Sequence, residues 1–388
     1  MIQPTPFCNI NCSYCYLPHR SSKKRFDLDL VEPLFAKLEA CGLLGDSLTV
    51  LWHAGEPLVM PVEFYREAFE RIHAASAKRS RVGHFFQTNA MLLSPEYCEL
   101  FKTFRVQVGI SVDGPEFIHD KYRTARGGKG TFRQVMSGVD LLRKHGVPFS
   151  AIAVLTADSL DYPHEIYDFF RDLRATSVGF NIDEMEGVHS SCSLASPLTE
   201  QRYTAFLATI FQRMVQDKGA VKIRELMQGF DSIQGTLFQA EPSSSESNPF
   251  SILSVDVDGN LATFSPELLD LTSADGTRYT IGSVADIDFT KAFSNPAFVE
   301  MNDAIQSGVA KCKEACGYFN ICGGGAPSNK LAENGSFDST ATLFCRYKKQ
   351  IVVDVVEDFV MSTLSEQKRS RRGANAPLPE IRRKSQFR

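Results

Sequence analysis

The sequence feature that most constrains the fold is a regular alternation of short apolar strands and amphipathic helices along the first half of the chain. This repeat is typical of a parallel sheet with right-handed crossovers. Five strands follow residue 44, and 2–7 would add a sixth. Six units are too few for an eight-stranded barrel, so we predict a partial (β/α)6 barrel with its chemistry at the carboxyl ends of the strands. The predicted strands are 47–53, 82–88, 106–112, 149–155 and 178–182, and the predicted helices are 28–44, 61–78, 95–104, 132–145 and 164–173.

Composition excludes several classes of protein. A length of 388 residues suits one large domain with a smaller one, and a net charge of −4 argues against nucleic acid as the main partner. No apolar run is long enough to cross a bilayer, and no signal peptide precedes the first cysteines, so no membrane partner is expected. Ten cysteines without a secretory signal indicate metal ligation in a reducing compartment. A cytoplasmic location is therefore predicted.

Three thiols lie close together near the start of the chain, at Cys8, Cys12 and Cys15. A short loop can turn these thiols toward one inorganic core, and three thiolates are one too few to close a four-ligand site. A [4Fe–4S] cluster held in this way keeps one iron free for another ligand. The alternatives are three unpaired buried thiols and a zinc site, for which His19 is the only nearby fourth ligand.

Polar side chains follow the predicted strands at their carboxyl ends. Gly55-Glu56-Pro57 comes after one strand, 87–89 after the next, 111–115 after a third, and the acidic stretch 181–186 after the last. Each segment by itself resembles an ordinary turn or helix cap. Because they recur at successive strand ends, we expect them to share one edge of the sheet with the cysteine loop.

The second half of the chain changes in composition. Two helices are predicted at 199–216 and 222–230, and a serine-rich run at 241–249 marks a boundary. An Asp-Gly turn then joins two short strands, at 251–255 and 261–264. A helix is predicted at 349–364, before a basic tail that we expect to be disordered and either to attract an acidic peptide or to aid solubility. The predicted divisions are a barrel at 1–185, a helical bridge at 186–240, a small domain at 241–348, and a C-terminal helix and tail at 349–388.

A second group of cysteines lies in the small domain. Cys312, Cys316 and Cys322 are separated by three and five residues, and Cys345 follows later. Four thiols close either a [4Fe–4S] site or a zinc site, because spacing alone does not name the metal. Three consecutive glycines at 323–325 allow the backbone to approach such a site closely. The other cysteines, Cys41, Cys98 and Cys192, have no ligand-spaced partners and are interpreted as packing residues.

The cysteine loop, the Gly-Glu-Pro turn and the Ser-x-Asp-Gly strand end together resemble the radical S-adenosylmethionine (SAM) enzymes. The resemblance covers residues 1–185, with Ala54 in place of the family's usual first glycine. It implies that Cys8, Cys12 and Cys15 bind a catalytic [4Fe–4S] cluster whose free iron chelates SAM. It also implies that Tyr14 lies beside the adenine and that Glu56 accepts the SAM amino group. The cofactor-binding residues that it implies are Tyr14, Gly55, Glu56, Asn89, Ser111, Asp113 and Arg123.

The second cysteine group resembles the auxiliary-cluster (SPASM) extension of peptide-modifying radical SAM enzymes. That extension often carries seven cysteines for two auxiliary clusters, whereas this chain has Ser254, Ser265 and Ala326 at three expected positions. The resemblance thus implies one auxiliary [4Fe–4S] cluster, bound by Cys312, Cys316, Cys322 and Cys345.

The segments 180–189, 254–259 and 263–268 are most similar to enzymes that form three-residue cyclophanes in ribosomally made, glycine-rich-repeat precursor peptides. The implied reaction removes a β-hydrogen from one residue and joins that carbon to an aromatic ring. The implied partners are a precursor peptide and an electron donor such as flavodoxin or ferredoxin.

The crosslinking reaction also needs an acceptor for a ring proton, and a carboxylate is suited to that task. The candidates are Asp183, Glu184, Glu186 and Glu267, which follow the last predicted strand or lie where the missing cluster would be. Two alternatives stay open. One is another radical SAM outcome on a peptide, such as formylglycine, a thioether or an epimer, and the other is a zinc-binding protein without enzyme activity.

Overall fold

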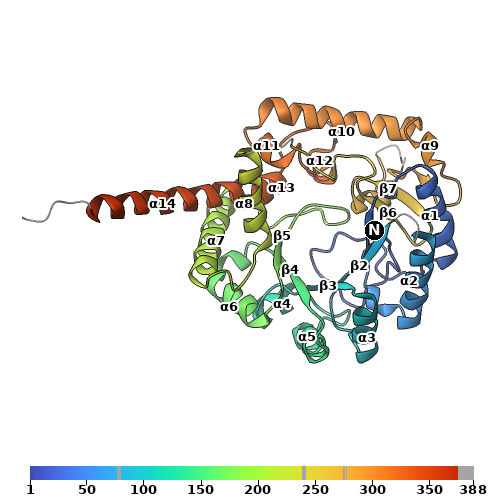
Figure 1. The fold of residues 1–388 in the computed structure, drawn as a ribbon, viewed down its shortest axis with the longest axis horizontal. Helices are drawn as coiled ribbons and strands as arrows, with labels where there is room; N and C mark the ends of the chain where they lie inside the picture. The colour runs from blue at the N-terminus through green and yellow to red at the C-terminus, as the bar shows by residue number, and fades with distance from the viewer. Residues whose placement is uncertain (77–79, 238–241, 274–275, 277, 375–388) are drawn as a thin grey trace, which may run out of the picture.

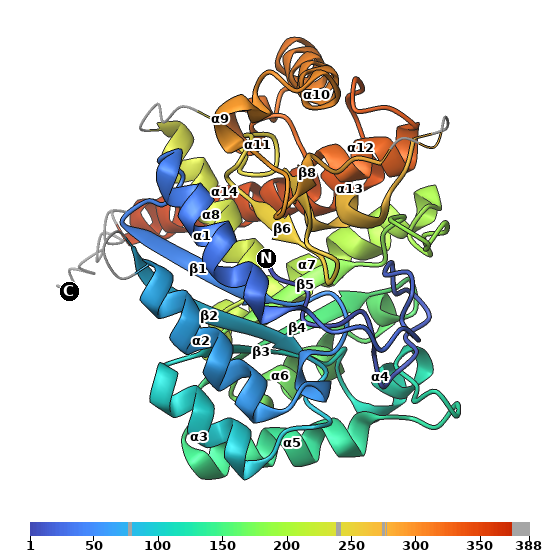
Figure 2. The ribbon, with the colours of Figure 1, turned by 90° about the vertical axis from the view of Figure 1, so that its right-hand side faces the viewer.

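The computed structural model describes residues 1–76, 80–237, 242–273, 276 and 278–374. Its main feature is a five-stranded parallel sheet with the strand order β1-β2-β3-β4-β5 (Figures 1 and 2). Because neighbouring strands are also consecutive in the sequence, each connection is a simple crossover, as the alternating pattern predicts. The strands are β1 (Ser47–Trp52), β2 (Arg81–Thr88), β3 (Gln107–Ser111), β4 (Phe149–Leu155) and β5 (Val178–Ile182).

Helices cover the outer face of this sheet (Figure 2). The core between them is rich in aromatic side chains, among which Trp52, Phe69 and Phe86 are fully buried. The ends of the helices follow local rules: Ser94 Oγ accepts a hydrogen bond from Tyr97 N where one helix begins, and Gly146, at a φ of 68°, ends another. The helices are α1 (Val31–Ala40), α2 (Val62–Ser76), α3 (Pro95–Phe104), α4 (Glu116–Tyr122), α5 (Phe132–His145) and α6 (Pro163–Leu173), with 3-10 turns at Leu28–Leu30, Pro57–Val59 and Ser159–Asp161.

The segment 2–7 contributes much less than a sixth strand. Ile2 alone forms bridges, one to Trp52 beside β1 and one to Val255 in a second sheet. Pro4 and Pro6 lack the N–H groups that a longer ladder needs, which explains why pairing stops there. The start of the chain therefore joins the two sheets instead of extending one of them.

The second sheet is small and antiparallel, with the order β6-β7-β8. Asp256 holds its predicted Asp-Gly turn, because Asp256 Oδ1 accepts hydrogen bonds from Asp258 N at 2.9 Å and Asn260 N at 2.8 Å. Two long helices precede this sheet, and the second extends beyond the predicted segment 222–230. These elements are α7 (Pro197–Gln216), α8 (Arg224–Leu237), β6 (Leu253–Val255), β7 (Asn260–Thr263), β8 (Gly282–Ser283) and a 3-10 turn at Pro266–Asp270.

Helices make up the rest of the chain. The long helix α10 (Pro296–Ala315) has no counterpart among the predicted elements, and α14 (Ile351–Ala374) continues past residue 364, so the expected disorder of 366–374 is wrong. Figure 1 shows α14 projecting from the body of the molecule. The remaining tail, 375–388, lies outside the described residues. The other elements are α9 (Phe289–Ala292), α11 (Phe319–Cys322), α12 (Pro327–Asn334), α13 (Leu343–Cys345) and a π-helical turn at Arg346–Gln350. Among the described residues, no helix combines the length and apolarity needed to cross a membrane.

Candidate active site

A cavity of about 210 Å³ opens at the carboxyl edge of the parallel sheet. Its lining includes the last residues of several strands, as the pattern of polar strand ends predicts. The structure also brings the first cysteine group to this cavity. The predicted site residues that line it are Cys8, Cys12, Tyr14, Cys15, Gly55, Glu56, Asn89, Ser111, Arg123, Asp183 and Glu184, whereas Asp113, Glu186 and Glu267 are outside its lining.

The cysteine loop is held against the C-terminal end of α4. Asn11 N donates to Thr124 O at 2.7 Å, and Ser13 N donates to Tyr122 O at 3.0 Å. Cys12 is buried, while Cys8 and Cys15 are partly exposed toward the cavity. Backbone hydrogen bonds to a neighbouring element therefore place three thiols around one space.

Two thiols of this loop are buried deeply enough that their ionised form needs a nearby positive charge. Burial raises the pKa of Cys8 to about 12 and that of Cys12 to about 11, so their thiolates need compensation. Asn89 Nδ2 approaches Cys8 Sγ at 3.9 Å, and Arg123 Nη1 approaches Cys12 Sγ at 3.8 Å. A metal cluster would supply the remaining charge, so three thiols with these donors fit an iron–sulfur cluster.

Arg123 belongs to a buried network on one wall of the cavity. Its Nη2 lies 3.0 Å from Asp113 Oδ1, and the Tyr14 hydroxyl donates to the other oxygen of Asp113. Asp113 also accepts a hydrogen bond from Val154 N at 2.9 Å, which fixes it to β4. Arg123 Nε is buried without a hydrogen-bond partner among the described residues. Arg123 and Tyr14 both line the cavity, so a guanidinium and an aromatic ring lie side by side there, and this pair suits the carboxylate and adenine of SAM.

The Gly-Glu-Pro turn also contributes to the wall of the cavity, through Gly55 and Glu56. Gly55 has a φ of +130°, and a Cβ at this position would lie 2.0 Å from Thr5 O, so only glycine fits. The Glu56 carboxylate accepts hydrogen bonds from Thr88 Oγ1 at 2.6 Å, Asn89 N at 2.8 Å and Leu58 N at 2.9 Å. Burial raises the pKa of Glu56 to about 7, and these donors oppose the rise. Both oxygens of Glu56 already contact protein donors, which makes this side chain an anchor for the turn.

The predicted carboxylates have two kinds of surroundings. Asp183 anchors a loop, because one of its oxygens lies 2.8 Å from His189 Nε2 and the other accepts from Ser193 N at 2.9 Å. Glu184, Glu186 and Glu267 instead influence one another electrostatically. Burial raises the pKa of all three, to about 7 for Glu184.

A fourth carboxylate belongs with these three and escaped the sequence analysis. Burial and the charge of Glu267 raise the pKa of Glu246, which lies in the serine-rich segment. Nothing in the local sequence singles out Glu246, since its neighbours arrive from other elements. We call Glu184, Glu186, Glu246 and Glu267 the acidic group.

The start of α12 connects the acidic group to the second cysteine group. Asn329 Nδ2 donates to Glu184 Oε2 at 2.8 Å, and the Ser328 hydroxyl hydrogen-bonds Glu186. The next residue, Lys330, hydrogen-bonds the thiol of Cys312. Three consecutive residues of one helix therefore contact both regions, and sequence reasoning missed all three.

The four later cysteines surround a separate cavity of about 270 Å³. They come from the end of α10, the loop that follows it, and the ends of α11 and α13. Gln350 Nε2 lies 4.0 Å from the sulfurs of both Cys316 and Cys345. Four thiols around a space of this size, with N–H donors to sulfur, fit a closed iron–sulfur site. Among the residues the structure describes, no three His, Cys, Asp or Glu side chains lie close enough together to hold one metal ion. The four thiols instead surround the larger space of the cavity.

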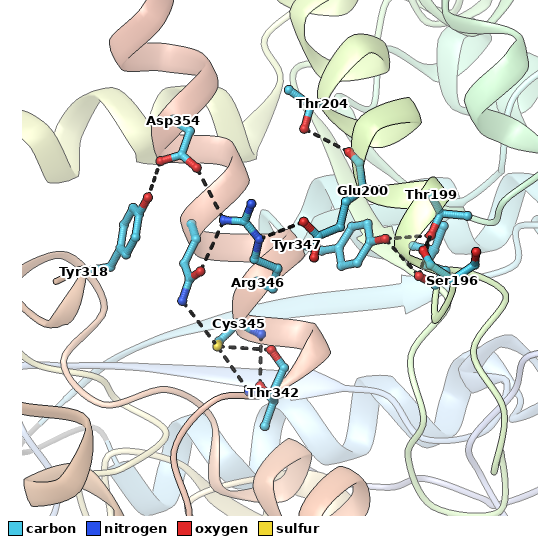
Figure 3. Close-up of polar contacts among 12 residues, drawn as sticks. Ser196, Thr199, Glu200, Thr204, Tyr318, Thr342, Cys345, Arg346, Tyr347 and Asp354 are labelled. Carbon is cyan, nitrogen blue, oxygen red and sulfur yellow. Dashed lines mark hydrogen bonds and ion pairs between the residues drawn. The ribbon is translucent and has the colours of Figure 1, made fainter. Parts of the chain in front are cut away.

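The chain that follows Cys345 holds this site against α7 (Figure 3). Arg346 lies 3.2 Å from Glu200 on α7 and 3.4 Å from Asp354 on α14, and the Tyr318 hydroxyl donates to Asp354. The Tyr347 hydroxyl contacts Thr199 at 2.7 Å. A π-helical turn allows this approach, and such turns are frequent at functional sites. The second cavity is thus fixed to the barrel by buried and half-buried polar contacts.

A parallel half-barrel with three loop thiols at its carboxyl edge, and a second cavity with four thiols, defines an iron–sulfur type of barrel protein. The model of the radical SAM superfamily matches residues 2–170. An uncharacterized protein of Synechocystis sp. is 40% identical over 362 residues, which make up 92% of this chain and 90% of that protein. The serine-type anaerobic sulfatase-maturating enzyme of Bacteroides thetaiotaomicron is 31% identical over 239 residues, 56% of this chain and 57% of that enzyme. The cysteine-type enzyme of Clostridium novyi is 26% identical over 353 residues, 87% of this chain and 89% of that enzyme.

Solved structures resemble the fold over most of the chain. Native anSMEcpe with bound AdoMet has a TM-score of 0.72 at 19% identity, covering 93% of this chain and 98% of that one. Streptococcus suis SuiB bound to S-adenosylmethionine has a TM-score of 0.61 at 15% identity, covering 89% of this chain and 76% of that one.

Residues 2–170 therefore form a radical SAM domain. The predicted fold class, a partial radical SAM barrel followed by a SPASM-type auxiliary-cluster domain, is confirmed. S-adenosylmethionine and a catalytic [4Fe–4S] cluster are the cofactors of this superfamily, and SPASM-type relatives carry an auxiliary cluster as well, so the predicted cofactors are confirmed.

Proposed function

We propose that this radical SAM protein modifies a ribosomally made precursor peptide by joining the β-carbon of one residue to an aromatic ring nearby in the sequence, giving a three-residue cyclophane. The observation that carries the proposal is the position of the acidic group. Glu184 lines the first cavity, and the same carboxylate is hydrogen-bonded to the helix that reaches the second cysteine group. Proton acceptors with raised pKa values thus lie beside the space where a substrate would react.

The cofactor roles are assigned to the residues that line each cavity. We assign the catalytic cluster to Cys8, Cys12 and Cys15, and the auxiliary cluster to Cys312, Cys316, Cys322 and Cys345. Arg123 would bind the SAM carboxylate through its guanidinium, and Tyr14 would contact the adenine. Gly55 and Glu56 shape the turn beside the methionine end, Asn89 and Ser111 line the ribose side, and Asp113 orients Arg123 and Tyr14. When bound, the cluster and SAM supply a 5′-deoxyadenosyl radical able to remove a hydrogen atom.

The balance of the reaction defines what the acidic group must do. Forming one carbon–carbon bond from a β-C–H and a ring C–H releases one hydrogen atom, one proton and one electron. Burial raises the pKa of Glu184 to about 7, and the charges of Glu246 and Glu267 add to the rise, so Glu184 accepts the ring proton. The auxiliary cluster, when bound, provides a one-electron acceptor. Asp183 keeps the adjacent loop in place, since its oxygens are both engaged.

Two structural relatives support a peptide substrate. SuiB has been solved with its precursor peptide SuiA, and anSMEcpe with the Cp18Cys peptide. We propose that this chain also takes a precursor peptide, and that a carrier such as flavodoxin or ferredoxin supplies its electrons.

The test uses the full chain, reconstituted anaerobically with iron and sulfide and supplied with SAM and a reductant. Its substrate is a synthetic peptide with repeated aromatic-x-x units. We expect the peptide to lose two hydrogens per crosslink, and we expect tandem mass spectrometry to give no fragments between the joined residues. A peptide with leucine in place of each aromatic residue is the matched control and should not be crosslinked. Loss of two hydrogens with normal fragmentation would contradict the proposal.

A second candidate is the oxidation of serine or cysteine to formylglycine. It is favoured by the curated relatives, which include serine-type and cysteine-type sulfatase-maturating enzymes. The two reactions differ in their product, because formylglycine is an aldehyde and a cyclophane is not. Labelling of the product peptide with a hydrazide probe would support the second candidate.

Metal analysis tests both candidates against a zinc protein. Two [4Fe–4S] clusters correspond to about eight irons per chain. Stoichiometric zinc in place of iron would contradict both enzymatic functions.

A further inference from the structure

Lys330 is a buried cation beside the second cysteine group. It lies on α12, its side chain lines the 270 Å³ cavity together with the four thiols, and the residue is only 3% exposed. Its ammonium group hydrogen-bonds the thiol of Cys312. Lysines are rarely buried to this extent unless an opposite charge compensates them.

The backbone around Lys330 provides space for this side chain. A Cβ at Gly308 on α10 would lie 3.1 Å from Lys330 Nζ and 2.3 Å from Phe337 O. A Cβ at Gly325 would lie 3.7 Å from Lys330 Cε. One glycine thus leaves room for the ammonium group, and another lies alongside the aliphatic stem. The absence of side chains at Gly308 and Gly325 therefore leaves space for the Lys330 side chain beside the cavity.

The described residues offer Lys330 no carboxylate in an ion pair. The charge of Lys330 lowers the pKa of Asp338, but Asp338 itself pairs with Lys311 at 2.8 Å on the surface. Four thiolates around the cavity are therefore the main source of opposite charge. Because a buried ammonium without compensation is strongly destabilising, the arrangement makes sense when the thiols are ionised by a bound metal cluster.

We propose that Lys330 is the buried counter-charge of the four-cysteine site and that it raises the reduction potential of the cluster bound there. The proposal rests on the proposed function, in which this site holds a [4Fe–4S] cluster. A positive charge hydrogen-bonded to a ligand sulfur stabilises the reduced cluster, which carries one more negative charge. Lys330 is thus a positioning residue that sets how readily the site accepts an electron. Its neighbour Asn329 contacts Glu184, so one helix serves both the electron acceptor and the proton acceptor.

The experiment is a potentiometric titration of the full chain in which Cys8, Cys12 and Cys15 are replaced by alanine, so that one cluster remains. Lys330→Met removes the charge while keeping an unbranched apolar side chain of similar length. We expect a more negative midpoint potential, with the equilibrium constant for reduction falling about tenfold, or about 59 mV for one electron. Lys330→Arg keeps the charge, so its midpoint potential should be close to that of the chain with Lys330.

Lys349→Met is the matched control, because Lys349 lines the same cavity but is partly exposed. Solvent screening should make its effect clearly smaller than that of Lys330→Met. Equal shifts from the two variants, or an unchanged potential in Lys330→Met, would overturn the proposal.

Iron and sulfide analysis of each variant separates this inference from the proposed function. About four irons per chain with an unshifted potential refutes the role of Lys330 alone. Zinc in place of iron refutes the assignment of the cluster, and the role of Lys330 with it. If Lys330→Met loses its cluster, Lys330→Gln, which retains a polar group, is titrated in its place, and the same criteria apply.

Discussion

The two cysteine sites of this protein use the same ligand in opposite ways. The first takes three thiols from one loop of eight residues that lies over the carboxyl edge of the sheet. The second takes four thiols from segments spread between Cys312 and Cys345. Around the first, Arg123 Nε is buried without a hydrogen-bond partner among the residues that the structure describes, whereas around the second Lys330 and Gln350 contact sulfur.

The number of thiols and the position of each site indicate different roles. The three-thiol site is suited to binding a reactive cofactor, and the four-thiol site is suited to accepting an electron. A three-thiol site leaves one coordination position for a cofactor, so its surroundings must be open and must carry groups that bind that cofactor. A four-thiol site has no such position, and its surroundings act on potential and stability instead. The acidic group meets the first region through Glu184, which lines the first cavity, and it meets the second region through α12.

The largest expected effect comes from removing one thiol from each site. Cys12→Ala should abolish SAM cleavage, whereas Cys316→Ala should retain cleavage and lose the modified peptide. Each variant should lose about four irons per chain. The measurements are chromatography of 5′-deoxyadenosine and mass spectrometry of the peptide. Cys98→Ala, which changes a buried cysteine outside both cavities, is the control, and equal loss of SAM cleavage in both site variants would contradict the division of roles.

The next effect concerns the buried pair of Arg123 and Asp113, whose side chains are 8% and 1% exposed. Arg123→Met leaves the Asp113 carboxylate buried and uncompensated, so we expect a loss of about 3–5 kcal/mol in the free energy of unfolding. Urea denaturation of the metal-free protein measures this change in the free energy of unfolding. The double variant with Asp113→Asn should recover part of the loss. Lys24→Met, which breaks an exposed pair with Asp258, should change stability by less than about 1 kcal/mol. Similar losses in both single variants would show that burial does not matter here.

Glycine substitutions should damage each site separately. A Cβ at Gly55 would lie 2.0 Å from Thr5 O beside the first site, and a Cβ at Gly323 would lie 2.7 Å from the backbone of Ser243 beside the second. We expect Gly55→Ala and Gly323→Ala each to destabilise the protein by more than about 1 kcal/mol, because both residues also have positive φ. Iron analysis should show a loss confined to the nearby cluster. Gly83→Ala, where a Cβ meets nothing within 4 Å, should keep both clusters.

The smallest effect is on the pH dependence of stability, through Glu184. Burial raises the pKa of Glu184 to about 7 from an ordinary value of 4.5, so the folded state binds more protons than the unfolded state between these values. Its contribution to stability is therefore fully present below about pH 4.5 and is lost as the pH rises through about 7. Glu184→Gln should flatten this part of the profile, measured by chemical denaturation from pH 5 to pH 8. The exposed Glu63→Gln should leave the profile unchanged, and a steeper profile in Glu184→Gln would contradict the assigned direction.

Much of the barrel could be predicted because its signals are local. The strands 149–155 and 178–182 and the helices 95–104 and 132–145 have the predicted bounds, since periodic burial, Ser94 and Gly146 mark them directly. The sixth strand failed because Pro4 and Pro6 lack backbone N–H groups, so pairing stops after the bridges of Ile2. The helix α10 escaped prediction although it supplies Cys312 to the second cavity.

The residues of the candidate site also divide into those that the sequence predicts and those that only the tertiary structure reveals. Asn89 was found because it follows a predicted strand, and Arg123, which caps α4, was found through the family resemblance; both line the cavity. From the sequence, Asp183 and Glu184 were equivalent candidates, and both line the cavity. In the structure, both oxygens of Asp183 anchor a loop, whereas burial raises the pKa of Glu184 to about 7. Glu246 and Lys330 carried no recognisable signal.

By itself, the sequence determined the spacing of both cysteine groups and the alternation that builds a parallel sheet. These properties follow from backbone geometry and from residues a few positions apart. Only the tertiary structure decided which carboxylates share one environment and which lysine is buried among thiols. Charge effects depend on distance and burial across the whole fold, and Ser328, Asn329 and Lys330 acquire their roles only when α12 meets the barrel and the second cavity together.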